Sequence, residues 1–156
     1  MSTVYLALGS NLGDRLHYIQ KAVAELKAHG LKVLKLSNII ETDPLEAPPQ
    51  GRFLNAVLKA QTHHSPEELI VITQGIERKL GRVKKIFRGP RVIDIDILLY
   101  DDIKLITPQL VIPHPRMLER FFVMQPLKEI EPNIAQSLDS PCSFALRSKA
   151  AGGMTN

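Results

Sequence analysis

One strand-like stretch of the chain carries two acidic side chains: residues 89–100 read GPRVIDIDILLY. Because successive side chains of a β-strand point to opposite faces, its three isoleucines share one face, and Asp94 and Asp96 share the other. At a spacing of about 6.5 Å and an effective dielectric of about 20, two bare charges repel by about 2.5 kcal/mol. A strand of this kind therefore needs something that offsets the repulsion.

Two interpretations of this strand are open. An antiparallel strand with one wet face ordinarily alternates apolar and polar residues, and it needs no ligand. Against this, residues 97–99 continue the strand with apolar side chains on both faces. Such a run indicates a strand that is covered on each side, where an unpaired carboxylate is costly. A metal ion or an arginine beside Asp94 and Asp96 would remove that cost.

Length and composition indicate a single globular domain. The chain has 156 residues, and 44% of them are hydrophobic, which suffices for one core but not for two. It starts without a basic leader or a long apolar segment, so we expect a cytoplasmic protein that is neither secreted nor membrane-spanning. The single cysteine, Cys142, excludes an internal disulfide. We expect one domain over residues 1–156, with a loosely ordered tail from about residue 131.

The order of the expected elements favours an α+β fold. One amphipathic helix is expected after Asp14, and a second after Ser65, where Ser65, Pro66 and Glu68 have the spacing of a capping-box start. Strand-like segments precede and follow both helices, which gives the order β-α-β-β-α-β. This is the ferredoxin-like arrangement, an antiparallel sheet with both helices on one face, here followed by a C-terminal extension. If the isoleucines pack beneath the helices, the two aspartates lie on the open face.

A basic segment leads into the strand with the two aspartates. Between Glu77 and Asp94 the chain has seven lysines and arginines and no acidic residue. About half of this charge needs no ligand, because cations are favoured near a helix C-terminus. The other basic residues place positive charges next to the negative charges of the two aspartates. Mg²⁺ with a polyphosphate would neutralise both sets, because Mg²⁺ binds one or two carboxylates together with phosphate oxygens, and the basic side chains can bind the phosphates. This combination is typical of phosphoryl transfer.

Other motifs add weaker signals. Neither a Walker P-loop nor a G-x-G-x-x-G motif occurs, so an ordinary P-loop nucleotide site is excluded. His114 lies between two prolines and could contact a phosphate, although an isolated loop histidine is more often a surface residue. Phe53 with Asn55 could hold a flat heterocycle, although phenylalanine is more often a core residue.

Two rival functions share part of this pattern. An RNA-binding module can have the same order of elements and a basic segment, but it needs stacking aromatic residues on its central strands. Residues 4–8 offer only Tyr5, and a strand with two carboxylates would repel RNA phosphates in the absence of metal. A regulator that binds substrate without catalysis is the other rival, and the intact acidic and basic residues argue against it. We therefore expect small-molecule partners and no nucleic acid.

Five motifs, taken in order, resemble one enzyme family. They are GSNLGD at 9–14, FLNA at 53–56, GR at 81–82, G-P-R-x-x-D-x-D at 89–96, and PHPRM at 113–117 with RFF at 120–122. Together they closely resemble 6-hydroxymethyl-7,8-dihydropterin pyrophosphokinase of folate biosynthesis over nearly all of residues 3–130, and the G-P-R-x-x-D-x-D element is the most specific. The resemblance implies transfer of diphosphate from ATP to the hydroxymethyl oxygen of the pterin, with release of AMP.

The resemblance also implies roles for individual residues, with Asp94 and Asp96 as the ligands of two Mg²⁺ ions. The expected catalytic residues are Arg82, Arg91, Asp94 and Asp96. The expected contacts of ATP are Gln74, Glu77, Lys84, Ile97, His114 and Arg120. The expected pterin slot consists of Thr42, Pro44, Leu45, Phe53, Asn55 and Phe122. An aspartate, a metal-bound water or no group at all remains open as the general base, and we expect the enzyme to act as a monomer.

Overall fold

An antiparallel sheet lies at the centre of the computed structural model, which describes residues 1–43, 52–81 and 92–133. Its strands are β1 (Ser2–Ser10), β2 (Lys32–Leu36), β3 (Ile40–Thr42), β4 (Phe53–Thr62) and β5 (Asp94–Tyr100). The strand order is β2-β4-β1-β5, and the short β3 also pairs with β4. All these pairs are antiparallel. In this order β1 lies between β4, which begins with Phe53, and β5, which carries the two aspartates.

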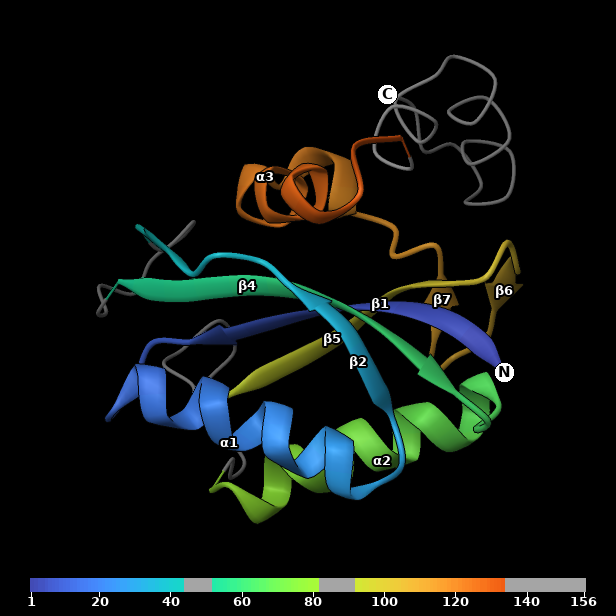
Figure 1. Ribbon diagram of the computed structural model, residues 1–156, viewed down its shortest axis with the longest axis horizontal. Coiled ribbons are helices and arrows are strands. Elements are labelled where there is room, and N and C mark those ends of the chain that lie inside the picture. The colour runs from blue at the N-terminus through green and yellow to red at the C-terminus, as the bar shows by residue number, and fades with distance from the viewer. Residues whose placement is uncertain (44–51, 82–91, 134–156) are drawn as a thin grey trace.

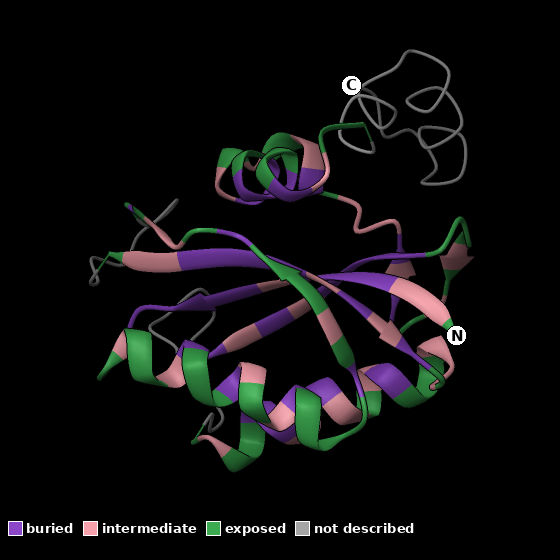
Figure 2. Ribbon diagram, in the orientation of Figure 1, coloured by how far each residue is buried: buried purple, intermediate pink, exposed green. Residues whose placement is uncertain are grey.

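Two helices, α1 (Arg15–Ala28) and α2 (Pro66–Lys79), cover one face of the sheet (Figure 1). Helix α1 begins where the Asp14 side chain accepts a hydrogen bond from a backbone N–H of the first turn, and α2 begins with the expected capping box of Ser65 and Glu68. Buried residues gather where the helices meet the sheet (Figure 2). The expected ferredoxin-like arrangement is therefore confirmed.

A third helix, α3 (Phe121–Ile130), lies over the opposite face of the sheet, after the short 3-10 helix η1 (Met117–Glu119) (Figure 1). Between α3 and the sheet, a second hydrophobic cluster contains Tyr5, Val57, Leu98, Leu99, Met117, Val123, Met124, Leu127 and Ile130. The face that we expected to be open is thus covered in part. We missed this cover because nothing in the local sequence of α3 indicates which surface it packs against.

A β-bulge in β5 explains the apolar run after the aspartates. Leu6 pairs with Ile97 whereas Tyr5 pairs with Leu99, so the register of β1 against β5 shifts at Leu98. Leu98 and Leu99 consequently both face α3, whereas Ile97 packs on the side of α1 and α2. The strand is covered on both faces, as its apolar run indicates, and simple alternation applies only to its first half.

The rest of the described chain is short and irregular. Strands β6 (Leu105–Ile106) and β7 (Val111–Ile112) form a separate antiparallel pair. None of the helices in the described ranges has the length and apolar character needed to cross a bilayer. Residues 134–156, most of the tail that we expected to be loosely ordered, lie outside the described part of the chain.

Candidate active site

Asp94 and Asp96 begin β5 on the sheet face that α3 covers in part. Their partners on β1 are Gly9 and Ala7, two residues with little or no side chain. Ile95, between the two acids, is 3% exposed and packs in the core beneath α1 and α2. The two carboxylates are partly exposed and share the other face, as the alternation of the sequence predicts.

Asn55 lies in the same row of the sheet as Asp94. In the antiparallel register, Asn55 of β4 is opposite Gly9 of β1, and Gly9 is opposite Asp94 of β5. Residues that are directly opposite one another project to the same face, so an amide and a carboxylate flank a glycine. Two strand spacings, about 10 Å in total, separate the backbones that carry these two polar groups.

The Asn55 amide has a defined orientation. Its Nδ2 donates a hydrogen bond to Thr42 Oγ1 at 2.8 Å, and both residues are buried. The Oδ1 atom lies on the side of Gly9, because a Cβ atom added to Gly9 would be 3.3 Å from it. The hydrogen bond to Thr42 thus leaves an acceptor directed over the glycine, where the backbone of β1 forms a floor between β4 and β5.

Aromatic rings lie near this floor. Phe53, two residues before Asn55 on β4, pairs with Thr42, and a Cβ atom added to Gly9 would be 3.9 Å from its ring. Phe122, at the start of α3, is partly buried against the cluster on the same sheet face. The guanidinium carbon of Arg120 lies 5.8 Å from the centre of the Phe122 ring. The structure therefore places both phenylalanines of the expected pterin slot on the sheet face that carries the two aspartates.

His114 is attached to the strand that carries the aspartates. Its backbone N–H donates to the carbonyl of Leu98 at 2.9 Å, two residues beyond Asp96 in β5. Its Nδ1 atom accepts a hydrogen bond from the backbone N–H of Arg116 at 3.2 Å. The expected phosphate contact thus lies in a loop that is fixed to β5.

Three expected nucleotide contacts lie on or behind β5. Glu77, on α2, is 7% exposed, and its Oε2 accepts a hydrogen bond from the backbone N–H of Ile95 at 2.8 Å. Ile97 is 2% exposed in the core beneath the helices, which leaves only its backbone for a nucleotide contact. Gln74 is exposed on α2. The structure gives Glu77 a role that the sequence did not indicate, namely support of the strand between the two aspartates.

Five expected site residues lie outside the described part of the chain: Pro44, Leu45, Arg82, Lys84 and Arg91. Their roles remain predictions. Among the described residues, Asp94 and Asp96 share a sheet face with Phe53, Asn55 and Phe122, and the substrate-binding roles of these residues stay predictions.

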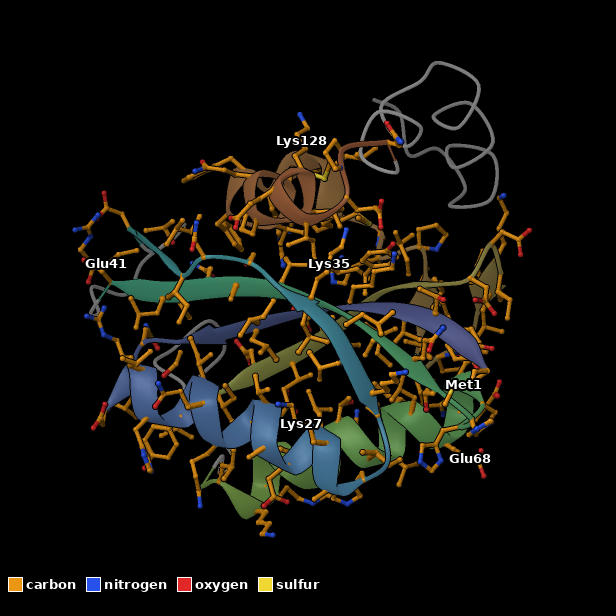
Figure 3. The ribbon with its side chains drawn as sticks, in the orientation of Figure 1. Met1, Lys27, Lys35, Glu41, Glu68 and Lys128 are labelled. Carbon is orange, nitrogen blue, oxygen red and sulfur yellow. The ribbon has the colours of Figure 1, made fainter. Side chains whose placement is uncertain are left out.

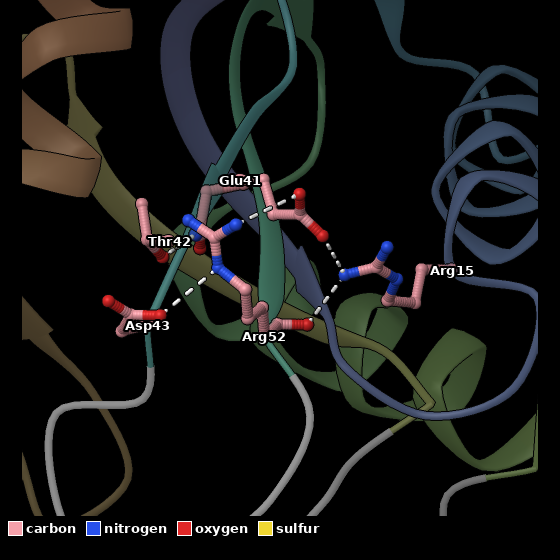
Figure 4. Close-up of polar contacts among 6 residues, drawn as sticks. Arg15, Glu41, Thr42, Asp43 and Arg52 are labelled. Atoms are coloured by element: carbon pink, nitrogen blue, oxygen red, sulfur yellow. Dashed lines mark hydrogen bonds and ion pairs between the residues drawn. The ribbon is translucent and has the colours of Figure 1, made fainter.

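An ionic network lies beside Thr42 and was missed by the sequence analysis (Figure 4). Arg15 Nη1 donates to Glu41 Oε2 at 2.7 Å and to the Arg52 carbonyl at 2.8 Å. Arg52 contacts Glu41 at 3.4 Å and Asp43 at 3.1 Å. The hydrogen bond from Arg15 holds the pKa of Glu41 below its ordinary value. The two partners of Arg15, Glu41 and Arg52, are 26 and 37 positions away from it in the sequence, so no local pattern could have predicted these contacts.

A second polar network fixes the end of α3 to the sheet. Glu131 Oε1 accepts hydrogen bonds from Tyr5 at 2.9 Å and from Lys59 at 2.7 Å. Lys35, which is labelled in Figure 3, donates to the Ile130 carbonyl at 3.0 Å. Burial, together with the hydrogen bond to Glu131, raises the pKa of Tyr5. The hydrogen bonds from Lys59 and Tyr5 lower the pKa of Glu131. These contacts hold the helix whose opposite end carries Phe122.

The chain is similar to one protein family over most of its length. The family model for 7,8-dihydro-6-hydroxymethylpterin-pyrophosphokinase (HPPK) matches residues 5–132. The 2-amino-4-hydroxy-6-hydroxymethyldihydropteridine pyrophosphokinase of Bacillus subtilis is 49% identical over 127 residues, which cover 81% of this chain and 76% of that protein. The enzyme of the same name from Aquifex aeolicus is 47% identical over 134 residues, which cover 86% of this chain and 83% of that protein.

Longer proteins contain a similar segment. The folic acid synthesis protein fol1 of Pneumocystis carinii is 48% identical over 127 residues, which cover 81% of this chain but 17% of that protein. A crystal structure of Plasmodium falciparum HPPK-DHPS with SDX-DHP has a TM-score of 0.64 at 16% identity, and the match covers 99% of this chain and 46% of that one. This structural likeness concerns the fold alone.

Proposed function

The chain belongs to the 7,8-dihydro-6-hydroxymethylpterin-pyrophosphokinase family, and from that premise we propose that Asp94 and Asp96 bind two Mg²⁺ ions that hold the triphosphate of ATP. The enzyme transfers diphosphate from ATP to 6-hydroxymethyl-7,8-dihydropterin, a step of folate biosynthesis. The observation that carries the proposal is the row Asn55, Gly9 and Asp94, which sets an amide and a carboxylate on either side of a glycine.

The chemistry of the two aspartates suits Mg²⁺. This ion takes one or two carboxylates together with phosphate oxygens and water, and both side chains are partly exposed on one face of β5. In the described ranges, no cluster of three or more His, Cys, Asp or Glu side chains could hold a metal ion alone, so the remaining ligands would be phosphate oxygens and water. When bound, Mg²⁺ would neutralise charge on the phosphate oxygens. Asp94 and Asp96 would orient the triphosphate at the start of β5.

The other side of the row suits the pterin. A carboxamide offers both a donor and an acceptor, which matches the edge of a pterin ring. The Nδ2 of Asn55 is held by Thr42, and this bond orients the Oδ1 over Gly9. The rings of Phe53 and Phe122 could pack against a flat heterocycle and shield the reaction from water. We propose that the pterin lies over Gly9, with its hydroxymethyl group directed toward β5.

These roles are consistent with a chemistry in which positioning dominates. Phosphoryl transfer needs an acceptor in line with the transferring phosphorus and cations around the phosphate oxygens, and it needs little covalent participation by the protein. Arg120 and His114 would add contacts to the triphosphate, as would the arginines that precede β5.

Replacement of Asp96 by asparagine tests the proposed metal site. Asp96→Asn preserves size but removes charge, so we expect AMP formation from ATP and hydroxymethyl-dihydropterin to fall about 100-fold or more. Asp102→Asn, in the exposed turn after β5, is the matched control and should leave the rate unchanged. Mn²⁺ binding with a nonhydrolysable ATP analogue, followed by electron paramagnetic resonance, should give two ions per chain and fewer in Asp96→Asn. Full activity of the variant, or one ion per wild-type chain, would refute the two-metal proposal.

A further inference from the structure

We propose that Arg15 is a positioning residue for the pterin, because its guanidinium joins the three chain segments that form the pterin side of the site. This inference rests on the proposed slot of Thr42, Phe53 and Asn55. Arg15 is the first residue of α1 and follows the short loop that begins after Ser10, the last residue of β1. Its contacts reach from there to β3 and to the residue that precedes β4.

The partners of Arg15 directly precede two residues of the slot. Nη1 donates to the Glu41 carboxylate at 2.7 Å and to the Arg52 carbonyl at 2.8 Å. Glu41 comes immediately before Thr42, Arg52 comes immediately before Phe53, and Thr42 pairs with Phe53 across the ladder of β3 and β4. A single nitrogen atom thus contacts the side chain of the residue before Thr42 and the backbone carbonyl of the residue before Phe53.

The ladder that Arg15 supports is short. β3 has three residues, and in the described part of the chain it pairs only with β4. A short strand at a sheet edge has few backbone hydrogen bonds to define its position, so a side-chain contact has a large share in setting it. A shift of β3 would move Thr42 Oγ1 away from Asn55 Nδ2, and the amide would lose the hydrogen bond that orients it.

The charges around Arg15 favour positioning over a direct contact with phosphate. The two arginines of the network contact Glu41, and Arg52 also contacts Asp43, so two cations are balanced by two carboxylates. A balanced cluster attracts a polyphosphate only weakly, because its net charge is close to zero. Arg15 moreover contacts β3 and the start of β4, which lie on the other side of β1 from Asp94 and Asp96. Its loss should therefore affect the pterin and leave ATP unaffected.

Steady-state kinetics of Arg15→Met test this inference. Methionine keeps an apolar stem and removes the donors, so we expect the KM for the pterin to rise about three- to fivefold, which is the range supported by an exposed ion pair. The KM for ATP and kcat should stay within about twofold of wild type, and Arg15→Lys should recover part of the loss. Lys79→Met is the matched control, because it removes an ion pair of 2.9 Å to Glu25 that links α2 to α1. It should change none of the three constants.

Each outcome has a defined meaning. An unchanged pterin KM in Arg15→Met, or parallel rises for pterin and ATP, would overturn the inference. If Arg15→Met has no effect while Asn55→Ala raises the pterin KM, the proposed slot stands and the role of Arg15 is wrong. If Asn55→Ala also leaves the pterin KM unchanged, the proposed function of the slot itself fails. Should Arg15→Met fail to fold, the comparison of Arg15→Lys with wild type decides: a folded lysine variant with a moderately raised pterin KM and an unchanged KM for ATP supports the inference, and wild-type values of both constants overturn it.

Discussion

The hydrogen bond between Glu77 and Ile95 predicts a large effect of Glu77→Ala on stability. Glu77 is 7% exposed, and its carboxylate accepts from the Ile95 N–H at 2.8 Å, between Asp94 and Asp96. Among the described strands, β5 pairs only with β1, so this N–H on the outer edge of β5 depends on a side chain of α2. Alanine would remove the acceptor and leave a buried donor unpaired.

The expected magnitude follows from the type of hydrogen bond. A bond to a charged group contributes about 1.5–3 kcal/mol, and an unpaired buried donor costs a similar amount. Removal of the carboxylate also relieves its own desolvation, which offsets part of the loss. We therefore expect Glu77→Ala to lower the free energy of unfolding by about 2–3 kcal/mol, and Glu77→Gln, which keeps an acceptor oxygen, by about 1 kcal/mol.

Urea denaturation followed by circular dichroism, without ligands, measures this effect. Gln74→Ala is the control on the same helix, because Gln74 is exposed and should change the free energy of unfolding by less than about 0.5 kcal/mol. The activity of Glu77→Ala at increasing Mg²⁺ should show a higher Mg²⁺ requirement, since the aspartates on either side of Ile95 lose their support. If Glu77→Ala retains wild-type stability and raises only the KM for ATP, Glu77 is a nucleotide ligand and the reasoning is refuted.

Two further predictions concern the other polar contacts of the sheet. Thr42→Val leaves the buried Nδ2 of Asn55 without its partner, so we expect a loss of about 1–3 kcal/mol in unfolding free energy and a higher pterin KM. The control is Thr73→Val, at a buried position within α2, which should leave the pterin KM unchanged. The hydrogen bond from Lys59 lowers the pKa of Glu131 below the ordinary value of 4.5. The ionised Glu131 therefore contributes its full share of the unfolding free energy above pH 4.5, and this share is lost as the pH falls through the lowered pKa. Denaturation between pH 7 and pH 3 should therefore show a smaller decline in stability for Glu131→Gln than for wild type, and equal declines would contradict the assignment.

Local patterns predicted the features that depend on neighbouring residues. The capping box of Ser65 and Glu68 was predicted because both partners lie within one helical turn. The shared face of Asp94 and Asp96 was predicted because side chains alternate along a strand. The order of helices and strands followed from the same short-range signals, and it was sufficient to indicate the ferredoxin-like arrangement.

Contacts between distant residues could not be predicted in this way. The apolar run after Asp96 indicated a strand covered on both faces, but the bulge at Leu98 and the helix that covers the second face became visible only in the structure. Glu77 and Ile95 are 18 positions apart, and Arg15 and Glu41 are 26 positions apart. The pterin slot was expected from a family resemblance, whereas the bond that orients Asn55 depends on the pairing of β3 with β4.

The glycine floor beneath the proposed pterin site bears on the design of inhibitors. A compound that occupies the space over Gly9 would rest on peptide backbone, which cannot be changed by exchanging one side chain for another. A resistance mutation at this position must add atoms, and the first of them would lie 3.3 Å from Asn55 Oδ1. Because the same amide would hold the natural substrate, escape from such a compound would come with impaired turnover.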